Sequence, residues 1–412
     1  MPFAIYILGL AVFAQGTSEF MLSGLVPDIA SELNVSIPAV GALTSAFAAG
    51  MIVGAPLMAV LSLRWPRRRA LLVFLVAFML VHVAGAVTTS FSVLLVTRVL
   101  GALANAGFLA VGLATATSMV PQNAKGRATS ILLGGITLAC VAGVPAGAAL
   151  GQTLGWRSAF WAVALISLPA VVAVMRSVPD TVRATGDPDE ARPRARRELR
   201  ALREPRLLVV LVLAALVNAA TFCTFTYLTP LVTNVSGFSE GWVPVMLALF
   251  GLGSFAGVTI GGRLSDTRPM LVLVPGGIAL LAGWALFALT AGGPIVTFLL
   301  TVVQGTLSFA VGSTLIAQVL YAAPRAPSLG GSFATAALNV GAAVGPAVGG
   351  ATIAAGLGYR SPLWVSALLV AAALVTAGLA QAIRQAPSPR GRRGAARPED
   401  GRAAPRTRPG GR

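Results

Sequence analysis

A single acidic side chain stands inside the first long apolar stretch of the chain. Glu19 lies mid-way along residues 4–26, which contain no other charged residue. A carboxylate at the centre of a bilayer costs at least ~2.5 kcal/mol on insertion scales, so an acid in such a place is a functional candidate by default. Because burial disfavours the charged form, this carboxyl could bind and release a proton as its access to water changes sides. The alternative is a structural acid that pairs with a neighbouring helix.

Four polar side chains could act together with Glu19. Gln15 and Ser23 stand four residues before and after it, a spacing that puts all three on one helix face. Arg98 is the only basic residue deep in an apolar run, and Asn105 follows it seven residues later on the same face. We predict that Arg98 is the partner or field source of Glu19 in proton coupling, and that the uncharged groups bind substrate. Alternatively, Arg98 is structural and extends its head group toward water.

Further uncharged polar and aromatic side chains lie in later apolar runs. They are candidates for substrate contacts, although each alone could instead be a hydrogen-bonding group between helices. The candidates are Asn218, Phe222, Phe225, Gln304 and Asn339. His82 is interpreted as a packing or hydrogen-bonding residue rather than a proton relay.

The sequence lacks the motifs of common catalytic and cofactor sites. It has no GxxxxGK[ST] phosphate loop, no Gly-x-Ser-x-Gly elbow and no metal-ligand spacing. Cys140 and Cys223 lie inside apolar runs without CxxC spacing, so we interpret them as core residues rather than a disulfide or metal site. We therefore expect no enzyme activity, no cofactor and no bound metal.

The composition indicates what kind of structure carries these residues. The chain has 412 residues, of which 56% are hydrophobic and 10% are charged, well below the roughly 25% charged residues of a soluble protein. Because about 20 apolar residues in a helix cross the hydrocarbon core, the apolar runs predict an all-α integral membrane protein with twelve transmembrane helices. They span residues 4–26, 38–62, 70–89, 91–118, 127–150, 158–177, 206–233, 242–263, 269–290, 293–321, 328–354 and 361–383.

The net charge of +17 reflects loops rather than a nucleic-acid surface. Basic residues gather in every second loop, for example in Arg64–Arg69, and no stripe of aromatic and basic residues accompanies them. The positive-inside rule then places these loops and both termini in the cytoplasm. The arginine- and alanine-rich composition indicates a bacterial plasma membrane. The basic tail is expected to be disordered, either solvated or in contact with anionic membrane lipid.

The two halves of the sequence repeat one another. Leu154–Trp161 matches Leu357–Trp364, and the same offset relates Pro27 to Pro230. We predict two pseudo-symmetric six-helix bundles, residues 1–178 and 206–384, joined by a cytoplasmic linker at 179–205 and followed by a tail at 385–412. Duplicated halves are typical of secondary transporters, in which the halves rock about a substrate site at their interface. We expect the chain to act as a monomer.

Closely spaced glycines and prolines mark helices that could move. Gly143, Pro145 and Gly147 occur in the fifth span, and similar runs occur in the eighth and eleventh. Small residues let helix backbones approach closely, and proline bends a helix. These spans are candidates for the moving interface, although generic tight packing would give the same pattern.

Several of these motifs resemble those of the major facilitator superfamily, in its twelve-helix drug:proton antiporter branch. The resemblance covers essentially the whole chain except the tail and rests on Gly16–Phe20 with Gly24–Ala30, on Arg98–Gly101 and on Gly143–Gly147. It implies conformational roles for Gly143, Pro145 and Gly147. The loop signature between spans 2 and 3 keeps Arg67 and Arg68 but has Leu63 in place of aspartate and Pro66 in place of glycine. The copy between spans 8 and 9 keeps Asp266 with Arg268, so a cytoplasmic charge latch would work from Asp266 against Lys125, Arg127 or the start of span 5.

The first 180 residues are also similar to the chloramphenicol-resistance exporters of actinomycetes, notably in Phe13–Gly24 and Ala102–Phe108. This resemblance implies proton-coupled export of chloramphenicol or a similar neutral, amphipathic drug. Because the same branch contains exporters of sugars and other metabolites, a metabolite exporter is the alternative. A non-transporting receptor or scaffold would need a soluble signalling module, and the linker and tail are too short and too polar to form one.

Overall fold

The computed structural model describes residues 2–61, 65–121, 124–178, 198, 200–326 and 329–385. Most of the linker predicted at 179–205, the tail beyond Gln385, and Arg64 lie outside these residues.

Within the described residues the chain is entirely helical, and twelve of its helices are long and apolar enough to cross a membrane. The spans are formed by α1 (Phe3–Phe20) with η1 (Met21–Gly24), α3 (Ile37–Leu61), α4 (Arg67–Val87), α5 (Phe91–Ser118), α6 (Lys125–Leu138) with η4 (Ala139–Gly143) and α7 (Val144–Leu154), α8 (Arg157–Ser177), α10 (Pro205–Thr226), α12 (Val243–Leu264), α13 (Pro269–Thr290), α14 (Pro294–Ala322), α15 (Gly330–Ala354) and α16 (Ser361–Gln385). Two short helices, α2 (Val26–Glu32) and α11 (Leu228–Asn234), follow the first and seventh spans. The prediction of an all-α protein with twelve spans is confirmed.

The outer surface of the helices suits hydrocarbon. Large apolar side chains such as Leu165, Leu289 and Leu368 are more than half exposed, while the backbone polar groups are paired within the helices. Lipid offers no hydrogen bonds, so this arrangement is the one that a spanning helix requires. The described part of the chain is therefore a multi-pass membrane protein.

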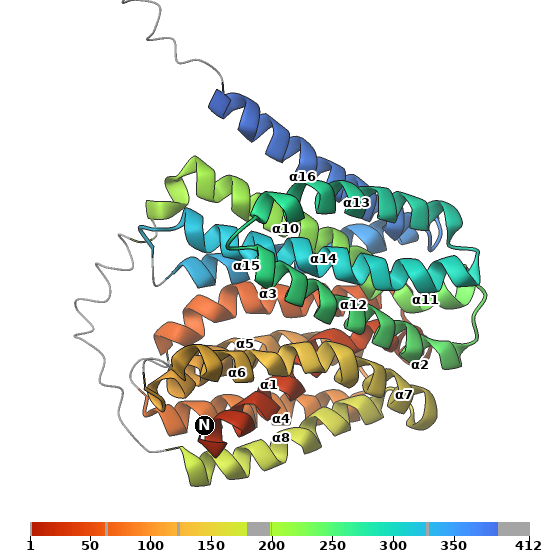
Figure 1. Cartoon of the computed structure of the whole chain (residues 1–412). Coiled ribbons are helices and arrows are strands. Elements are labelled where there is room, and N and C mark those ends of the chain that lie inside the picture. Colours follow the sequence, from red (N-terminus) through yellow and green to blue (C-terminus); the bar gives the residue numbers. More distant parts are fainter. Residues whose placement is uncertain are drawn as a thin grey trace, which may run out of the picture.

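The spans form two groups in space. Helices α1 to α8 pack mainly on one another, as do α10 to α16, and Figure 1 shows the two groups as the warm and cool colours. Contact between the groups runs mainly through α3 with α15 and through η4 and α7 with α12. The predicted division into bundles at residues 1–178 and 206–384 stays a prediction.

Hydrogen bonds between the groups gather toward the end of the molecule that carries α2 and α11, opposite the N-terminus (Figure 1). The Thr229 hydroxyl donates to the Ser23 carbonyl at 2.6 Å, and the Gln152 amide donates to the Glu240 carbonyl at 2.5 Å. Farther along α3, the Ser45 hydroxyl donates to the carbonyl of Ala343 at 2.7 Å. The structure is therefore closed at the α2/α11 end.

The first and seventh spans are broken at equivalent places. The sequence predicted unbroken helices to 26 and 233, but α1 ends at Phe20 and α10 ends at Thr226. Proline explains the breaks, because it has no N–H to donate to the carbonyl four residues earlier. Pro27 thus leaves the Ser23 carbonyl free, and this is the carbonyl that accepts the Thr229 hydroxyl. The breaks also place Glu19 in the last turn of α1.

The fifth span contains a π-helical turn, η4, directly before α7, whose second residue is Pro145. Such turns often mark functional sites. Gly251 of α12 lies so close to the backbone carbonyl of Cys140 that a Cβ would overlap it, so this glycine allows spans 5 and 8 to approach across the two groups. Gly341, Gly345 and Gly349 of the eleventh span face α10 within their own group, whereas Gly350 also lies close to Pro38 of α3 across the two groups.

Candidate functional site

Arg98 is buried and is held by the last turn of α1. Its Nη1 donates to the Ser18 hydroxyl and its Nη2 donates to the Ser18 carbonyl, both at 3.0 Å. The guanidinium also lies over the ring of Phe47, 4.4 Å from its centroid. The side chain is 2% exposed, and the two hydrogen bonds of its guanidinium go to neutral oxygens of Ser18. Only Nε has no hydrogen-bond partner among the described residues.

The same serine connects Arg98 to His82 of α4. The Ser18 hydroxyl and His82 Nε2 lie 2.6 Å apart, and His82 Nδ1 lies 2.7 Å from the Phe78 carbonyl. Both residues are buried, and the imidazole packs between the rings of Phe78 and Phe160. The interpretation of His82 as a hydrogen-bonding residue therefore holds, and its partner ties α4 to α1 and α5.

Glu19 is half-buried beside this network. Its carboxyl interacts electrostatically with Arg98 and with Cys140 of the π-helical turn. Among the described residues, however, no ion pair within 4.0 Å joins it to Arg98. The structure thus brings the two predicted proton-coupling residues together at the end of α1 without a direct contact.

The other predicted polar residues of the first half differ in whether their side chains have hydrogen-bond partners. Gln15 and Asn105 are both buried, and neither Gln15 amide atom nor the Asn105 Oδ1 has a partner in the described part of the chain. Ser23 lies beyond the break, in η1, where its hydroxyl donates to the Phe20 carbonyl at 2.8 Å. The helical spacing that would align it with Glu19 ends at Phe20. Gln15 and Asn105 therefore have unused hydrogen-bonding capacity, and the Ser23 hydroxyl has a partner on its own segment.

In the second half, the aromatic candidate Phe222 reaches the interface between the groups and contacts the other candidate, Phe225. The ring of Phe222 lies 5.7 Å from that of Phe20, between centroids, and 6.2 Å from Phe225. The amide candidates are bonded to nearby backbone: Asn218 donates to the Leu338 carbonyl at 2.6 Å, and Asn339 to its own helix. Asn218 thus makes the kind of bond between helices that was the alternative interpretation, whereas the bond of Asn339 lies within α15.

Gln304 lines a small internal cavity of the second half. Its Nε2 donates to the Leu280 carbonyl at 3.2 Å, whereas its Oε1 is unpartnered in the described structure, as is the indole nitrogen of Trp284. The cavity measures about 10 Å³, room for about one water molecule. It is lined by Thr224, Phe225, Leu228, Phe250, Trp284, Phe287, Thr301 and Gln304.

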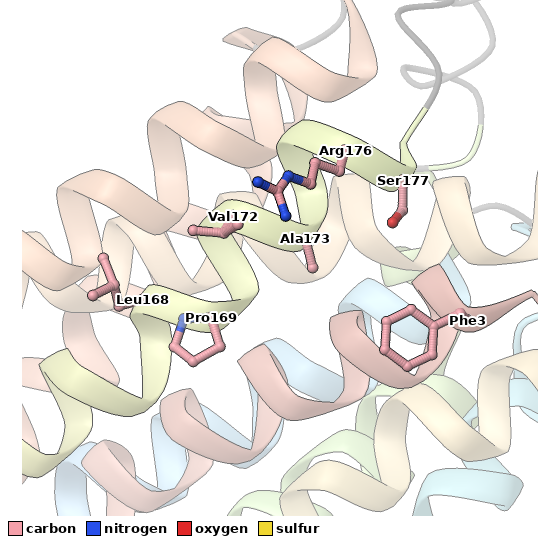
Figure 2. Close-up of a pocket in the computed structure, with 7 residues that line it drawn as sticks. All are labelled: Phe3, Leu168, Pro169, Val172, Ala173, Arg176 and Ser177. Atoms are coloured by element: carbon pink, nitrogen blue, oxygen red, sulfur yellow. The ribbon is translucent and has the colours of Figure 1, made fainter.

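A larger hollow of about 450 Å³ lies on the outer surface, between the beginning of α1 and the end of α8. Figure 2 shows Phe3 on one wall, Pro169 and Val172 on the other, and Arg176 near one end. None of the predicted site residues lines it, and its apolar walls face the region where lipid would lie. We do not place the substrate there.

The predicted latch residues are not joined across the two groups. Asp266 accepts a hydrogen bond from Tyr321 of its own group at 2.8 Å, and within the described residues it forms no ion pair with Lys125 or Arg127. Arg67 begins α4 and donates to Ser118, with Arg68 beside it, and Arg268 precedes α13. In the fifth span, Gly143 lies against Thr17 of α1, and Pro145 and Gly147 lie in α7.

The family model of the Major Facilitator Superfamily matches residues 8–331. The chain belongs to this superfamily. It is a membrane transporter of small molecules rather than an enzyme, and the predicted superfamily is confirmed.

Relatives match over almost the whole length. A chloramphenicol resistance protein of Streptomyces lividans is 56% identical over 380 residues, which cover 92% of this chain and 96% of the relative. The inner membrane transport protein YdhP of Escherichia coli K12 is 35% identical, covering 89% of this chain and 93% of its own. A crystal structure of a bacterial homolog of the human lysosomal transporter Spinster, inward-facing and unoccupied, has a TM-score of 0.74 at 17% identity and covers 94% of this chain and 98% of that one. The last likeness supports the fold alone.

Sequence reasoning missed Ser18, Phe47 and Trp284. Ser18 is next to Glu19 in the sequence but on a different helix face, so a search for residues four positions apart does not find it. Phe47 and Trp284 occur in apolar runs, where an aromatic residue gives no signal of its own.

Proposed function

We propose that the protein is a proton-coupled efflux transporter that exports chloramphenicol or a similar neutral, amphipathic drug and thereby confers resistance. The observation that carries the coupling is the arrangement of Glu19 next to a buried, neutrally held Arg98. The 56% identity to the Streptomyces lividans resistance protein supports the substrate.

In this proposal Glu19 carries the proton. It is the only acid in the interior of a span among the described residues, and it lies at the break of the first span. Arg98 provides a fixed positive field close by, so the charge of Glu19 depends on how the surrounding helices pack. A proton that enters from outside drives the return step. One charge crossing 100 mV supplies about 2.3 kcal/mol, enough for roughly a 50-fold gradient of a neutral substrate.

The substrate site is formed by uncharged groups from both halves. Gln15 and Asn105 offer unpartnered amide atoms, and Phe222 and Phe225 offer aromatic surface near the interface. Gln304 adds an unpartnered amide oxygen. A site with one titratable acid and no second carboxylate favours a neutral ligand over a cation.

Transport proceeds by alternating access between two six-helix bundles. The protein lies in the bacterial plasma membrane as a monomer, with its basic loops and both termini in the cytoplasm. The contacts at the α2/α11 end then make this structure closed to the outside. The unformed contact between Asp266 and Lys125 or Arg127 fits the same state. A cysteine at Ser239 should react with an impermeant thiol reagent from outside, and one at Gly186 should not. The reverse pattern would overturn this orientation.

The proposed function is tested in inverted membrane vesicles with an imposed pH gradient and labelled chloramphenicol. Wild type should accumulate the drug. Glu19→Gln, which keeps size and hydrogen bonding but fixes the neutral form, should bind drug and exchange it without accumulating it. Glu19→Asp should retain partial accumulation.

Glu240→Gln is the matched control, since this exposed acid lies outside the site, and it should accumulate the drug like wild type. Equal accumulation by Glu19→Gln would place the proton site elsewhere, with Asp28 the next acid to test. Wild-type vesicles that ignore chloramphenicol but concentrate a sugar or another neutral compound would leave the mechanism standing and replace the substrate.

A further inference from the structure

Arg98, Ser18 and His82 form a continuous hydrogen-bonded chain that joins three helices. Arg98 of α5 donates to Ser18 of α1, Ser18 contacts His82 of α4 at 2.6 Å, and His82 contacts the carbonyl of Phe78 at 2.7 Å. All three side chains are at least 97% buried. Buried polar networks are stabilising only when every member is satisfied, so their proton positions are strongly constrained.

The partners determine which atoms carry protons. The Phe78 carbonyl can only accept, so His82 Nδ1 must be the N–H. In the neutral ring Nε2 is then an acceptor, which receives the Ser18 O–H, and the Ser18 oxygen receives Arg98 Nη1–H. In this order the His82 N–H, the Ser18 O–H and the Arg98 Nη1–H each meet an acceptor, and Arg98 Nε is the one donor nitrogen left without one among the described residues. A second proton on Nε2 would leave the Ser18 O–H without its acceptor and would put a second cation beside Arg98.

We propose that Ser18 and His82 are positioning residues for proton coupling, which hold Arg98 on the last turn of α1 and keep it from forming an ion pair with Glu19. This inference rests on the proposed role of Glu19. Nη1 and Nη2 are both engaged by Ser18, and the guanidinium face lies on Phe47, so the cation has one orientation. Glu19 then feels the field of Arg98 without a direct contact, and its proton remains free to exchange.

Loss of the Ser18 hydroxyl removes the acceptor of Arg98 Nη1, and the carboxyl that interacts electrostatically with this guanidinium is that of Glu19. Arg98 can then turn to Glu19 and form a charge-assisted pair, which is stronger than a bond to a neutral oxygen. The groups around Glu19 and His82 include Arg98 from α5, Cys140 from η4, Phe160 from α8 and Phe47 from α3. Among these neighbours Arg98 alone is a cation. A change in the position of its guanidinium therefore changes the electrostatic field at Glu19.

The first test reads the network directly. His82 is the only histidine of the chain, so ¹⁵N-histidine labelling of the full-length protein, purified through a histidine-free tag in lipid nanodiscs, gives one imidazole spectrum. At pH 7.5 the wild type should show the neutral ring with its proton on Nδ1. Ser18→Ala and Arg98→Ala should change the Nε2 shift. A proton on Nε2, or an imidazolium, would overturn the proposal without reference to transport.

The second test separates a positioning role from a structural one. Ser18→Ala should lower drug-induced proton release about tenfold, the factor expected for one hydrogen bond to a charged group, while drug affinity changes less than about twofold. His82→Gln, whose amide reaches the place of Nε2, should keep much of the wild-type proton release. His82→Asn, whose amide reaches only the place of Nδ1, should lose it.

Ser366→Ala is the matched control. Ser366 is fully buried in α16 and donates to the carbonyl of Ala220 at 2.6 Å, so its loss removes an equivalent bond between two helices of the other group. It should lower thermal stability but leave the ratio of protons to drug unchanged. Full proton release in Ser18→Ala, or an equal loss in Ser366→Ala, would refute the positioning role alone. Wild-type protein that releases no protons on drug binding would instead remove the proposed function and this inference with it.

Discussion

The hydrogen bond between Thr229 and Ser23 offers a way to shift the balance between access states. The Thr229 hydroxyl is buried and reaches across the two groups of helices to the Ser23 carbonyl, which Pro27 leaves without its usual helical partner. Thr229→Val keeps the shape of the side chain and removes the donor. In the closed arrangement the carbonyl is then buried and unpaired, whereas separation of the groups exposes it to water.

The magnitude follows from that difference. A buried polar group left without its partner costs about 1–3 kcal/mol. At 1.4 kcal/mol per factor of ten, Thr229→Val should lower the ratio of closed to open forms at the α2/α11 end about tenfold. Spin labels at Ser31 and Ser239, both exposed and on opposite groups, should show a larger population at long distance by pulsed electron paramagnetic resonance.

Thr221→Val is the matched control. Thr221 is also buried in α10, but its hydroxyl donates to the Val217 carbonyl of the same helix, so both access states lose the same bond. The distance distribution of this variant should match wild type. Equal distributions for Thr229→Val and Thr221→Val would show that the bond between the groups does not hold the α2/α11 end closed.

Three further outcomes follow from single contacts. Arg98→Lys should express normally but transport at least about tenfold more slowly in the vesicle assay, because lysine keeps the charge and loses the fork that grips two oxygens. Gly251→Ala should lower the melting temperature and widen the spin-label distance, since the new Cβ overlaps a backbone carbonyl of η4. Burial first, and then Glu240 and Glu32, raise the pKa of Asp28 in the closed arrangement. That arrangement should therefore weaken as pH rises from the usual aspartate pKa through the raised one, and Asp28→Asn should remove the dependence on pH. An Asp28→Asn protein whose closed arrangement still weakens as pH rises would contradict the assignment of this pH dependence to Asp28.

The twelve spans could be predicted because long apolar runs leave few alternatives in a membrane. The nearness of Glu19 and Arg98 could also be predicted, since each is the lone charge in its span and neither is tolerated without a polar environment. The sequence did not predict that Ser18 would stand between Arg98 and His82. That contact depends on how α1 is rotated against α4 and α5, and no spacing along one helix specifies such a rotation.

The breaks in the first and seventh spans could have been predicted in part. Pro27 and Pro230 stand at equivalent places, and each removes the donor that the carbonyl four residues earlier would use. Which group then pairs with the freed carbonyl depends on the packing of the two halves. The sequence therefore shows that a threonine stands at position 229, but it does not predict that its hydroxyl bonds to the Ser23 carbonyl.

The repeat also shows what the two halves do not share. At the offset that relates Leu154 to Leu357, Phe222 stands for Glu19, Thr301 for Arg98 and Ala285 for His82. The second half keeps the helix break and loses the whole charged network. If Glu19 carries the proton, the coupling chemistry is confined to one half, while both halves keep the helix break. The position equivalent to Glu19 instead holds a ring that packs on Phe20 across the interface, at 5.7 Å between centroids. A change in the packing of α1 on protonation would therefore reach the aromatic side of the substrate site through one direct contact.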